Sequence, residues 1–215
     1  MEGTRTYFGT DGVRGIVGES LSADLVRRLG RAFGLRSESK RVLIGRDTRE
    51  SGERFERVLA AGIEDAGAIA QLGGVLPTPA VALLAEGEGA VISASHNPPE
   101  YNGVKFFAQG GRKLTDDEEL SIEELLDDSG PGGGEVVTVE GVGARYIELI
   151  TERFGSPLDG LKLVVDCANG AFAGLAPPVF EALGAKVTAI GSEPDGTNIN
   201  VGCGATDPAL LSETV

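Results

Sequence analysis

The densest group of reactive side chains lies in residues 91–105, directly after a run of apolar residues. It combines hydroxyl, imidazole, amide and amine groups, on Ser93, Ser95, His96, Asn97 and Lys105. Two prolines and an Asn-Gly pair restrict the backbone of this turn. A serine held rigidly at a strand end can act as a nucleophile and accept a phosphoryl group. A lysine on the next strand could return toward it, to neutralise phosphate or move a proton. The alternative is a rigid turn with a purely structural role.

Two further loops offer groups that could bind an anion. Residues 9–15 (GTDGVRG) contain three glycines, which allow a ligand to approach the backbone, and Arg14, whose guanidinium suits phosphate. Residues 45–49 (GRDTR) follow an apolar run, and ligands of open α/β sheets gather beyond the carboxyl ends of strands. Arg46 is the candidate ligand there. The alternatives are a tight turn with a surface arginine in the first loop and a structural Arg–Asp pair in the second.

Signatures of several other enzyme classes are missing from the sequence. There is no Walker phosphate loop, no complete GxGxxG and no GxSxG. The one histidine, His96, adjoins Ser95, so we expect the two side chains to diverge, which argues against a Ser-His-Asp hydrolase. With this one histidine, Cys167 and Cys203 are too few for a zinc site, and we expect inert thiols in a reducing compartment.

Composition bounds the class of protein. The 215 residues are 41% hydrophobic and 24% charged, which is ordinary for a globular chain and excludes wholesale disorder. The formal net charge of −14 argues against nucleic-acid binding. No apolar run approaches the ~20 residues of a membrane span, and the N-terminus does not resemble a secretory signal. We therefore expect a cytoplasmic protein that binds neither nucleic acid nor membrane.

Hydrophobic periodicity predicts the elements that position these loops. We expect Ser22 to cap a helix that ends at Gly34, Ser51 to cap a second that ends at Gly67, and Pro77 to start a short third. The expected strands are residues 41–45, 68–72, 89–94 and 104–108. This alternation predicts an α/β fold, a mixed or parallel sheet covered by helices.

The second half of the sequence repeats this alternation. Thr115 opens a capping box, and we interpret the eight acids between residues 116 and 128 as a solvated helix face and not as a metal site. The glycine-rich segment 129–134 (SGPGGG) is typical of a flexible surface turn. The remaining expected elements are a helix over 141–154, a strand over 161–165, a helix over 175–183, a strand over 186–190 and a helix begun by Asp207 and Pro208.

We place a domain boundary near residues 152–157. The first domain is then 1–153, and residues 154–215 form the incomplete start of a second, similar α/β domain. A half-domain of about 60 residues rarely buries enough surface to be stable alone. We therefore expect the chain to be the front part of a longer protein.

Five segments resemble motifs of the α-D-phosphohexomutases. Residues 93–98 (SASHNP) with 102–107 (NGVKFF) resemble the active-serine signature of this superfamily. Residues 7–15 (YFGTDGVRG) are similar to its bacterial phosphoglucosamine mutase branch, as are 165–171 (VDCANGA) and 194–200 (PDGTNIN). The similarity extends in order over the whole chain.

The resemblance implies a phosphoenzyme mechanism. Ser95 would carry a phosphate, pass it to a hexose 6-phosphate and recover the other phosphate from the 1,6-bisphosphate. Lys105 and Arg14 match residues that support proton transfer and phosphate binding, and His96 matches a position beside the nucleophile. The expected substrate- and phosphate-binding residues are Thr10, Arg14, Arg46 and Asn97. Mg²⁺ would bind a phosphate oxygen on Ser95.

The sequence also departs from the family pattern. The other magnesium ligands are aspartates of an Asp-Gly-Asp-Gly-Asp-Arg loop, which is absent here and is expected beyond Val215, together with the third and fourth domains. We therefore expect the 215-residue polypeptide to be inactive by itself. The resemblance implies that the whole protein interconverts glucosamine 6-phosphate and glucosamine 1-phosphate for amino-sugar nucleotide synthesis. A phosphomannomutase or phosphoglucomutase, and a non-catalytic phosphosugar-binding module, stay open, as does a homodimer of the full-length protein.

Overall fold

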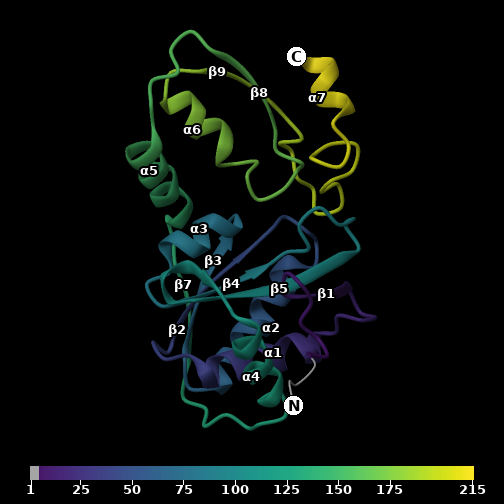
Figure 1. The fold of residues 1–215 in the computed structure, drawn as a ribbon, viewed down its shortest axis with the longest axis vertical. Coiled ribbons are helices and arrows are strands. Elements are labelled where there is room, and N and C mark those ends of the chain that lie inside the picture. Colours follow the sequence, from purple (N-terminus) through teal and green to yellow (C-terminus); the bar gives the residue numbers. More distant parts are fainter. Residues whose placement is uncertain (1–4) are drawn as a thin grey trace.

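The computed structural model describes residues 5–215, whose strands form one large and one small sheet (Figure 1). The seven-stranded sheet has the order β1-β5-β4-β2-β3-β7, and β6 pairs with β5. Its strands are β1 (Val13–Ile16), β2 (Arg41–Arg46), β3 (Ile69–Val75), β4 (Glu88–Ile92), β5 (Tyr101–Ala108), β6 (Arg112–Lys113) and β7 (Glu135–Thr138). β4, β2, β3 and β7 are parallel neighbours, whereas β5 is antiparallel to β1, β4 and β6. The sheet is therefore mixed, as predicted.

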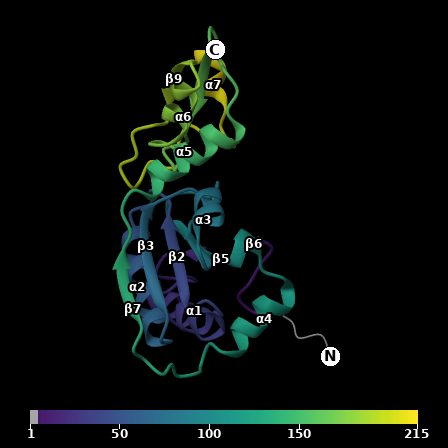
Figure 2. The ribbon, with the colours of Figure 1, turned by 90° about the vertical axis from the view of Figure 1, so that its left-hand side faces the viewer.

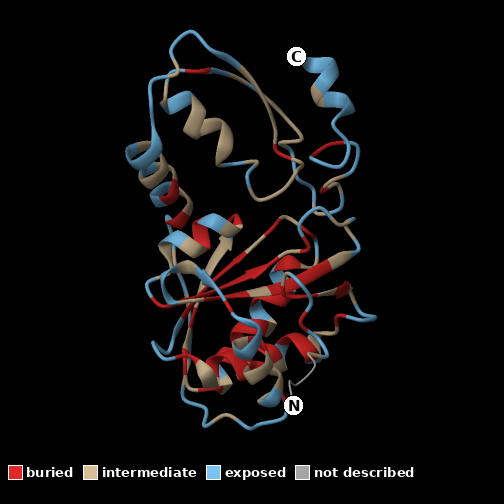
Figure 3. Cartoon of the chain, viewed as in Figure 1, coloured by how far each residue is buried: buried red, intermediate tan, exposed pale blue. Residues whose placement is uncertain are grey.

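Helices cover both faces of this sheet. On one face lie α1 (Ala23–Arg36), α2 (Gly52–Asp65) and α4 (Asp116–Glu124), and on the other lie α3 (Thr78–Leu84) and α5 (Val142–Phe154) (Figure 1, Figure 2). The side-chain period of two in β2 explains the two cores: Val42 and Ile44 belong to the α1–α2 core and Leu43 to the α3–α5 core. Buried residues are concentrated in the seven-stranded sheet and the helices that cover it (Figure 3).

The second region of the chain, residues 155–215, holds a two-stranded parallel sheet. Its elements are β8 (Lys162–Asp166), α6 (Ala176–Ala182), β9 (Lys186–Ile190) and α7 (Ala209–Thr214). The predicted βαβ order is present, and the predicted domain boundary falls at the end of α5. Pro208 occupies the N-cap of α7, one residue later than the Asp207 we expected. None of the helices within residues 5–215 has the length and apolar character needed to cross a bilayer.

Two helix ends differ in detail from the prediction. Ser22 caps α1 as expected, but the helix passes Gly34 and ends at Arg36. Gly34 is buried against α2, where a Cβ would lie 2.8 Å from the Cβ of Ala66, so the glycine permits close helix packing. Ser51 occupies the N-cap of α2 as expected, but its backbone is helical (φ −72°, ψ −11°) and its side chain makes no capping hydrogen bond. Its hydroxyl accepts from Asn102 Nδ2 at 2.9 Å instead.

The acidic helix α4 is only partly solvated. It begins with the predicted capping box at Thr115. Glu119, however, is 3% exposed and pairs with Arg5. The carboxylate of Glu123 accepts hydrogen bonds from three consecutive backbone N–H groups, those of residues 6–8, at 2.7–2.9 Å. The interpretation of the whole run as a solvated face is therefore wrong, since α4 holds the chain that leads to β1.

Strand β7 was not expected from the sequence. It follows the Gly-rich segment 129–134 and extends the sheet by pairing parallel to β3. Gly132 N–H donates to Asp65 O at 2.8 Å, so this segment lies against the end of α2 before β7 begins.

Candidate active site

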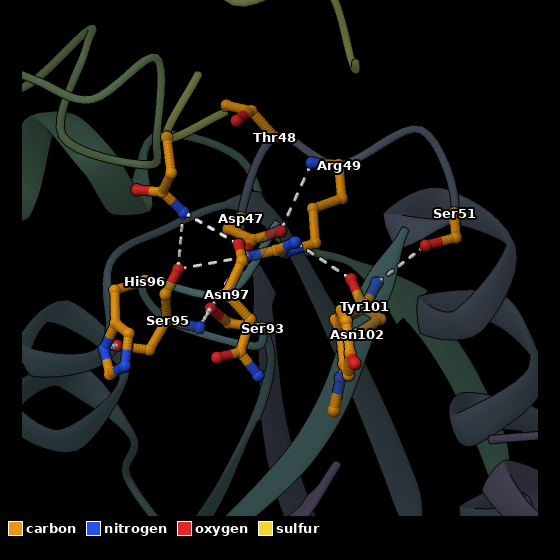
Figure 4. A network of polar contacts seen from close by, with 12 residues as sticks. Asp47, Thr48, Arg49, Ser51, Ser93, Ser95, His96, Asn97, Tyr101 and Asn102 are labelled. Carbon is orange, nitrogen blue, oxygen red and sulfur yellow. Dashed lines mark hydrogen bonds and ion pairs between the residues drawn. The ribbon is translucent and has the colours of Figure 1, made fainter. Parts of the chain in front are cut away.

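The loops after β2 and β4 meet because these strands are parallel neighbours that end together. Arg46 is paired with Ile92 at the end of the ladder, and Asp47 N–H donates to Ile92 O at 2.9 Å. Ser93 Oγ then donates to Asp47 Oδ2 at 2.7 Å (Figure 4). The topology thus brings residues 45–49 against the serine loop, residues 93–102.

Arg49 organises the serine loop (Figure 4). Its side chain has no exposed surface, and its Nε donates to Asp47 Oδ2 at 2.9 Å. Its two terminal nitrogens donate to four loop carbonyls, those of Ser95, Asn97, Pro98 and Tyr101. The structural Arg–Asp pair left open above is therefore present. Sequence reasoning missed the four carbonyls, since nothing near Arg49 in the chain indicates them.

Ser95 is held in a left-handed backbone conformation, with φ of 56°. This region is sparsely populated by residues other than glycine and costs on the order of 1 kcal/mol or more. The Ser95 N–H donates to Ser93 Oγ at 3.0 Å, and its side chain is exposed. Its Oγ lies 3.5 Å from His96 Nδ1, so the expected divergence of the two side chains is wrong.

Two cavities meet at Ser95. One, of about 260 Å³, is lined by Asp11, Arg14, Thr78, Val91, Ser93, Ser95 and Lys105. The other, of about 230 Å³, shares four of these residues and extends to the second region through Cys167, Phe172, Ile199 and Asn200. The first cavity therefore brings the predicted Ser95, Lys105 and Arg14 together.

Strand register and a glycine position the two cations. Arg14 pairs across from Gly103, and Lys105 pairs across from Val91. A Cβ on Gly103 would lie 2.7 Å from Val13 O and 2.8 Å from the Cγ of Arg14, so only glycine lets β1 pass this closely. The Arg14 Nε is buried without a hydrogen-bond partner among the described residues.

Asp11 joins these two cations. Its carboxylate accepts from Arg14 on one oxygen and pairs with Lys105 on the other. Burial raises the pKa of the Asp11 carboxyl, but the hydrogen bond from Lys105 and the nearby positive charges outweigh it, so the pKa lies below its ordinary value. Asp11 was not among the predicted site residues, although it lies inside the GTDGVRG segment.

The other predicted residues lie around these cavities and do not line either. Arg46 pairs with Glu56 on α2 at 3.1 Å. Thr10 is exposed, and its carbonyl accepts from Lys113 Nζ at 2.5 Å. Asn97 contributes its carbonyl to the Arg49 network. His96 contacts Ser95 from the exposed side.

The second region also reaches the serine loop. Asn200 Nδ2 donates to the carbonyls of Ser95 and Asn97 at 2.9 and 3.1 Å. Thr48 Oγ1 donates to Asn169 O, and Glu50 N–H donates to Gly196 O at 2.8 Å. The segment around residue 200 was recognised only as a motif, and its contact with the loop was not foreseen.

Within residues 5–215, no three or more His, Cys, Asp or Glu side chains are grouped to hold a metal ion. The two carboxylates that line the cavities are already engaged, Asp11 by two cations and Asp47 by Arg49 and Ser93. The residues described do not by themselves fit a metal centre. They fit an anion, because a serine hydroxyl faces one arginine and one lysine.

Fold and site together define an α/β domain with a serine, an arginine and a lysine in one cavity. Residues 5–131 match the family model described as phosphoglucomutase/phosphomannomutase, alpha/beta/alpha domain I, and the chain belongs to this family. A solved phosphoglucomutase/phosphomannomutase family protein from Burkholderia thailandensis is similar at 32% identity and a TM-score of 0.76, over 86% of this chain and 43% of that one.

Curated relatives are similar over nearly all of the chain. It is 48% identical to a phosphoglucosamine mutase of Ectopseudomonas mendocina and 44% identical to one of Clostridioides difficile. Each alignment covers 98% of this chain and 51% of the relative. The chain therefore spans about half the length of the curated relatives it matches.

Proposed function

We propose that this chain is the serine-bearing part of a phosphoglucosamine mutase, which interconverts glucosamine 6-phosphate and glucosamine 1-phosphate. The observation that carries the proposal is the cavity in which Ser95 faces Arg14 and Lys105. The names of the relatives support the choice of sugar.

In the proposed reaction Ser95 is a phosphoryl carrier. The phosphate on its Oγ passes to the 1-hydroxyl of glucosamine 6-phosphate: the P–Oγ bond breaks, a sugar O–P bond forms, and the hydroxyl proton ends on Ser95 Oγ. The 1,6-bisphosphate then turns over, and its 6-phosphate returns to Ser95. Because charge stabilisation and positioning dominate phosphoryl transfer, the fixed guanidinium of Arg14 and the ammonium of Lys105 supply the positive field. Asp11 holds both cations in place, and Lys105 supports the proton transfer.

Mg²⁺ is part of the proposal. From this chain it would take only the phosphate on Ser95, and its remaining ligands would come from outside residues 5–215. When bound, it would neutralise charge on the transferring group.

We further propose that the protein acts in the cytoplasm on a free phosphosugar, without nucleic acid or membrane, and that a homodimer forms in the full-length protein. The two cysteines of the described chain are free and buried, which suits a reducing compartment. We expect the 215-residue polypeptide to show no turnover alone, because part of the proposed metal site lies outside it.

The test is a turnover assay on the full-length gene product. Conversion of glucosamine 6-phosphate should exceed that of glucose and mannose 6-phosphates, and Ser95→Ala should abolish it. Ser129→Ala, which removes an exposed hydroxyl away from the cavities, is the matched control and should be fully active. Faster turnover of mannose or glucose phosphates would assign a different sugar. Binding of phosphosugar without turnover would assign a non-catalytic module.

A further inference from the structure

Asn200, in the second region of the chain, forms hydrogen bonds with the serine loop. Its amide donates to the carbonyl oxygens of Ser95 and Asn97 at 2.9 and 3.1 Å. The same two carbonyls accept from Arg49 Nη2 at 3.0 and 2.9 Å. Each carbonyl is therefore held by two donors, one from the loop after β2 and one from a segment more than 100 residues away in sequence.

The backbone of Ser95 needs such support. A serine at φ of 56° persists only where its surroundings hold it. Arg49 and Asn200 are the two side chains of residues 5–215 that donate to its carbonyl. Asn200 is itself left-handed, at φ of 61°, a conformation that asparagine tolerates better than most residues. The asparagine therefore suits both the turn and the contact.

We propose that Asn200 is a positioning residue, whose amide fixes the serine loop so that Ser95 Oγ is aligned for phosphoryl transfer. The inference rests on the proposed function, because it takes Ser95 as the phosphoryl carrier. The position of Ser95 Oγ then depends on residues 155–215, the second region of the chain. Asn200 forms no hydrogen bond with Arg14 or Lys105, so its loss acts on the transfer step and leaves phosphate binding intact.

Two variants remove the amide in different ways. Asn200→Gly deletes it while keeping the positive φ accessible. Asn200→Asp keeps the shape but turns a carboxylate oxygen toward two carbonyl oxygens. The matched control is Thr197→Val, which removes the exposed hydrogen bond from Thr197 Oγ1 to Asp195 Oδ1 in the same segment as Asn200 and leaves the donors to the serine loop in place.

The experiment uses the full-length protein and glucosamine 1,6-bisphosphate. Intact mass follows phosphate transfer to Ser95: an Oγ–P bond forms, a sugar O–P bond breaks, and the serine proton ends on the released sugar oxygen. Steady-state kcat and KM, and amide exchange of peptides covering residues 93–102, are measured on the same samples.

We expect both Asn200 variants to lower the phosphorylation rate and kcat by about 10- to 100-fold, the range that a misplacement of about 1 Å produces. KM should change by less than about 3-fold, because the phosphate-binding residues stay in place. Exchange in residues 93–102 should be faster. Thr197→Val should match the wild type in all of these.

Three results would overturn the inference. Asn200→Gly and Asn200→Asp could both transfer phosphate at the wild-type rate. Thr197→Val could lose as much kcat as Asn200→Gly, which would indicate general loosening of the segment that carries Asn200. If wild-type protein takes up no phosphate on Ser95, the proposed function fails, and the inference fails with it.

Discussion

Replacing Arg49 by methionine tests whether this side chain holds the serine loop together. The guanidinium is fully enclosed, and the Asp47 side chain is 6% exposed. In Arg49→Met the Asp47 carboxylate loses the cation with which it pairs, and the carbonyls of Pro98 and Tyr101 lose the side-chain donor that Arg49 supplies. Removing one partner of a buried ion pair costs about 3–5 kcal/mol. Domains are stable by roughly 5–15 kcal/mol, so a large share of the stability should be lost.

The assay is urea unfolding of the 215-residue chain, followed by far-UV circular dichroism. The midpoint should fall strongly in Arg49→Met, and less in Arg49→Lys, which keeps the charge but not the planar fork. Arg57→Met is the matched control: Arg57 pairs with Glu53 on the solvated face of α2, and the midpoint should stay at the wild-type value. A loss below about 1 kcal/mol in Arg49→Met, the size of an average substitution, would refute the reasoning.

Three further predictions concern contacts that stabilise the first region of the chain. Gly103→Ala places a Cβ 2.7 Å from Val13 O, so β1 must shift; we expect a loss of about 1–3 kcal/mol in urea unfolding. Burial raises the pKa of the Glu88 carboxyl, but hydrogen bonds led by that from Ser39 outweigh it, so the pKa is lowered. The ionised form therefore stabilises the fold above the ordinary glutamate pKa, and the stability difference between wild type and Glu88→Gln should shrink as the pH falls from about 6 to about 3. Glu123→Ala should speed amide exchange in residues 6–8, which lose their shared acceptor.

Each of these predictions has a control or a contradicting result. Gly174→Ala is the control for Gly103→Ala, since nothing lies within 4 Å of its added Cβ. If both variants lost the same unfolding free energy, the loss in Gly103→Ala would not come from the close approach of β1. A pH-independent difference for Glu88→Gln would show that its carboxylate is not stabilised by folding. Glu124→Ala, at the exposed neighbouring position on α4, should leave exchange at residues 6–8 unchanged.

Local signals predicted most of the fold, and long-range packing decided the exceptions. The Ser22 cap and the Thr115 capping box are contained within one helical turn, so the sequence alone indicates them. Strand β7 is four residues long and gains its hydrogen bonds from β3, more than 60 residues earlier. Gly34 carries a helix-end signal, but its contact with Ala66 gives it a packing role that no local pattern reveals.

The site also combines residues that local motifs indicate with residues whose roles depend on long-range contacts. Ser95, Lys105 and Arg14 could be predicted because each lies in a short sequence motif. Strand β5 and its neighbours bring all three to one cavity. The roles of Arg49 and Asn200 depend on carbonyls 46 to 52 and 103 to 105 residues away. Every residue has a carbonyl, so side-chain types cannot indicate such partners.

The central claim is that Ser95 carries the phosphate, and peptide mapping tests it most directly. The full-length protein would be isolated from its natural source and measured by intact mass and phosphopeptide sequencing. The account predicts that a fraction of the molecules is heavier by one phosphate, about 80 Da, located on Ser95. When glucosamine 6-phosphate with an isotopically labelled phosphate is supplied, the label should appear on Ser95, because the 6-phosphate of the intermediate returns to this serine in each cycle. An actively converting enzyme whose phosphate lies on another residue, or that never carries phosphate, would contradict it.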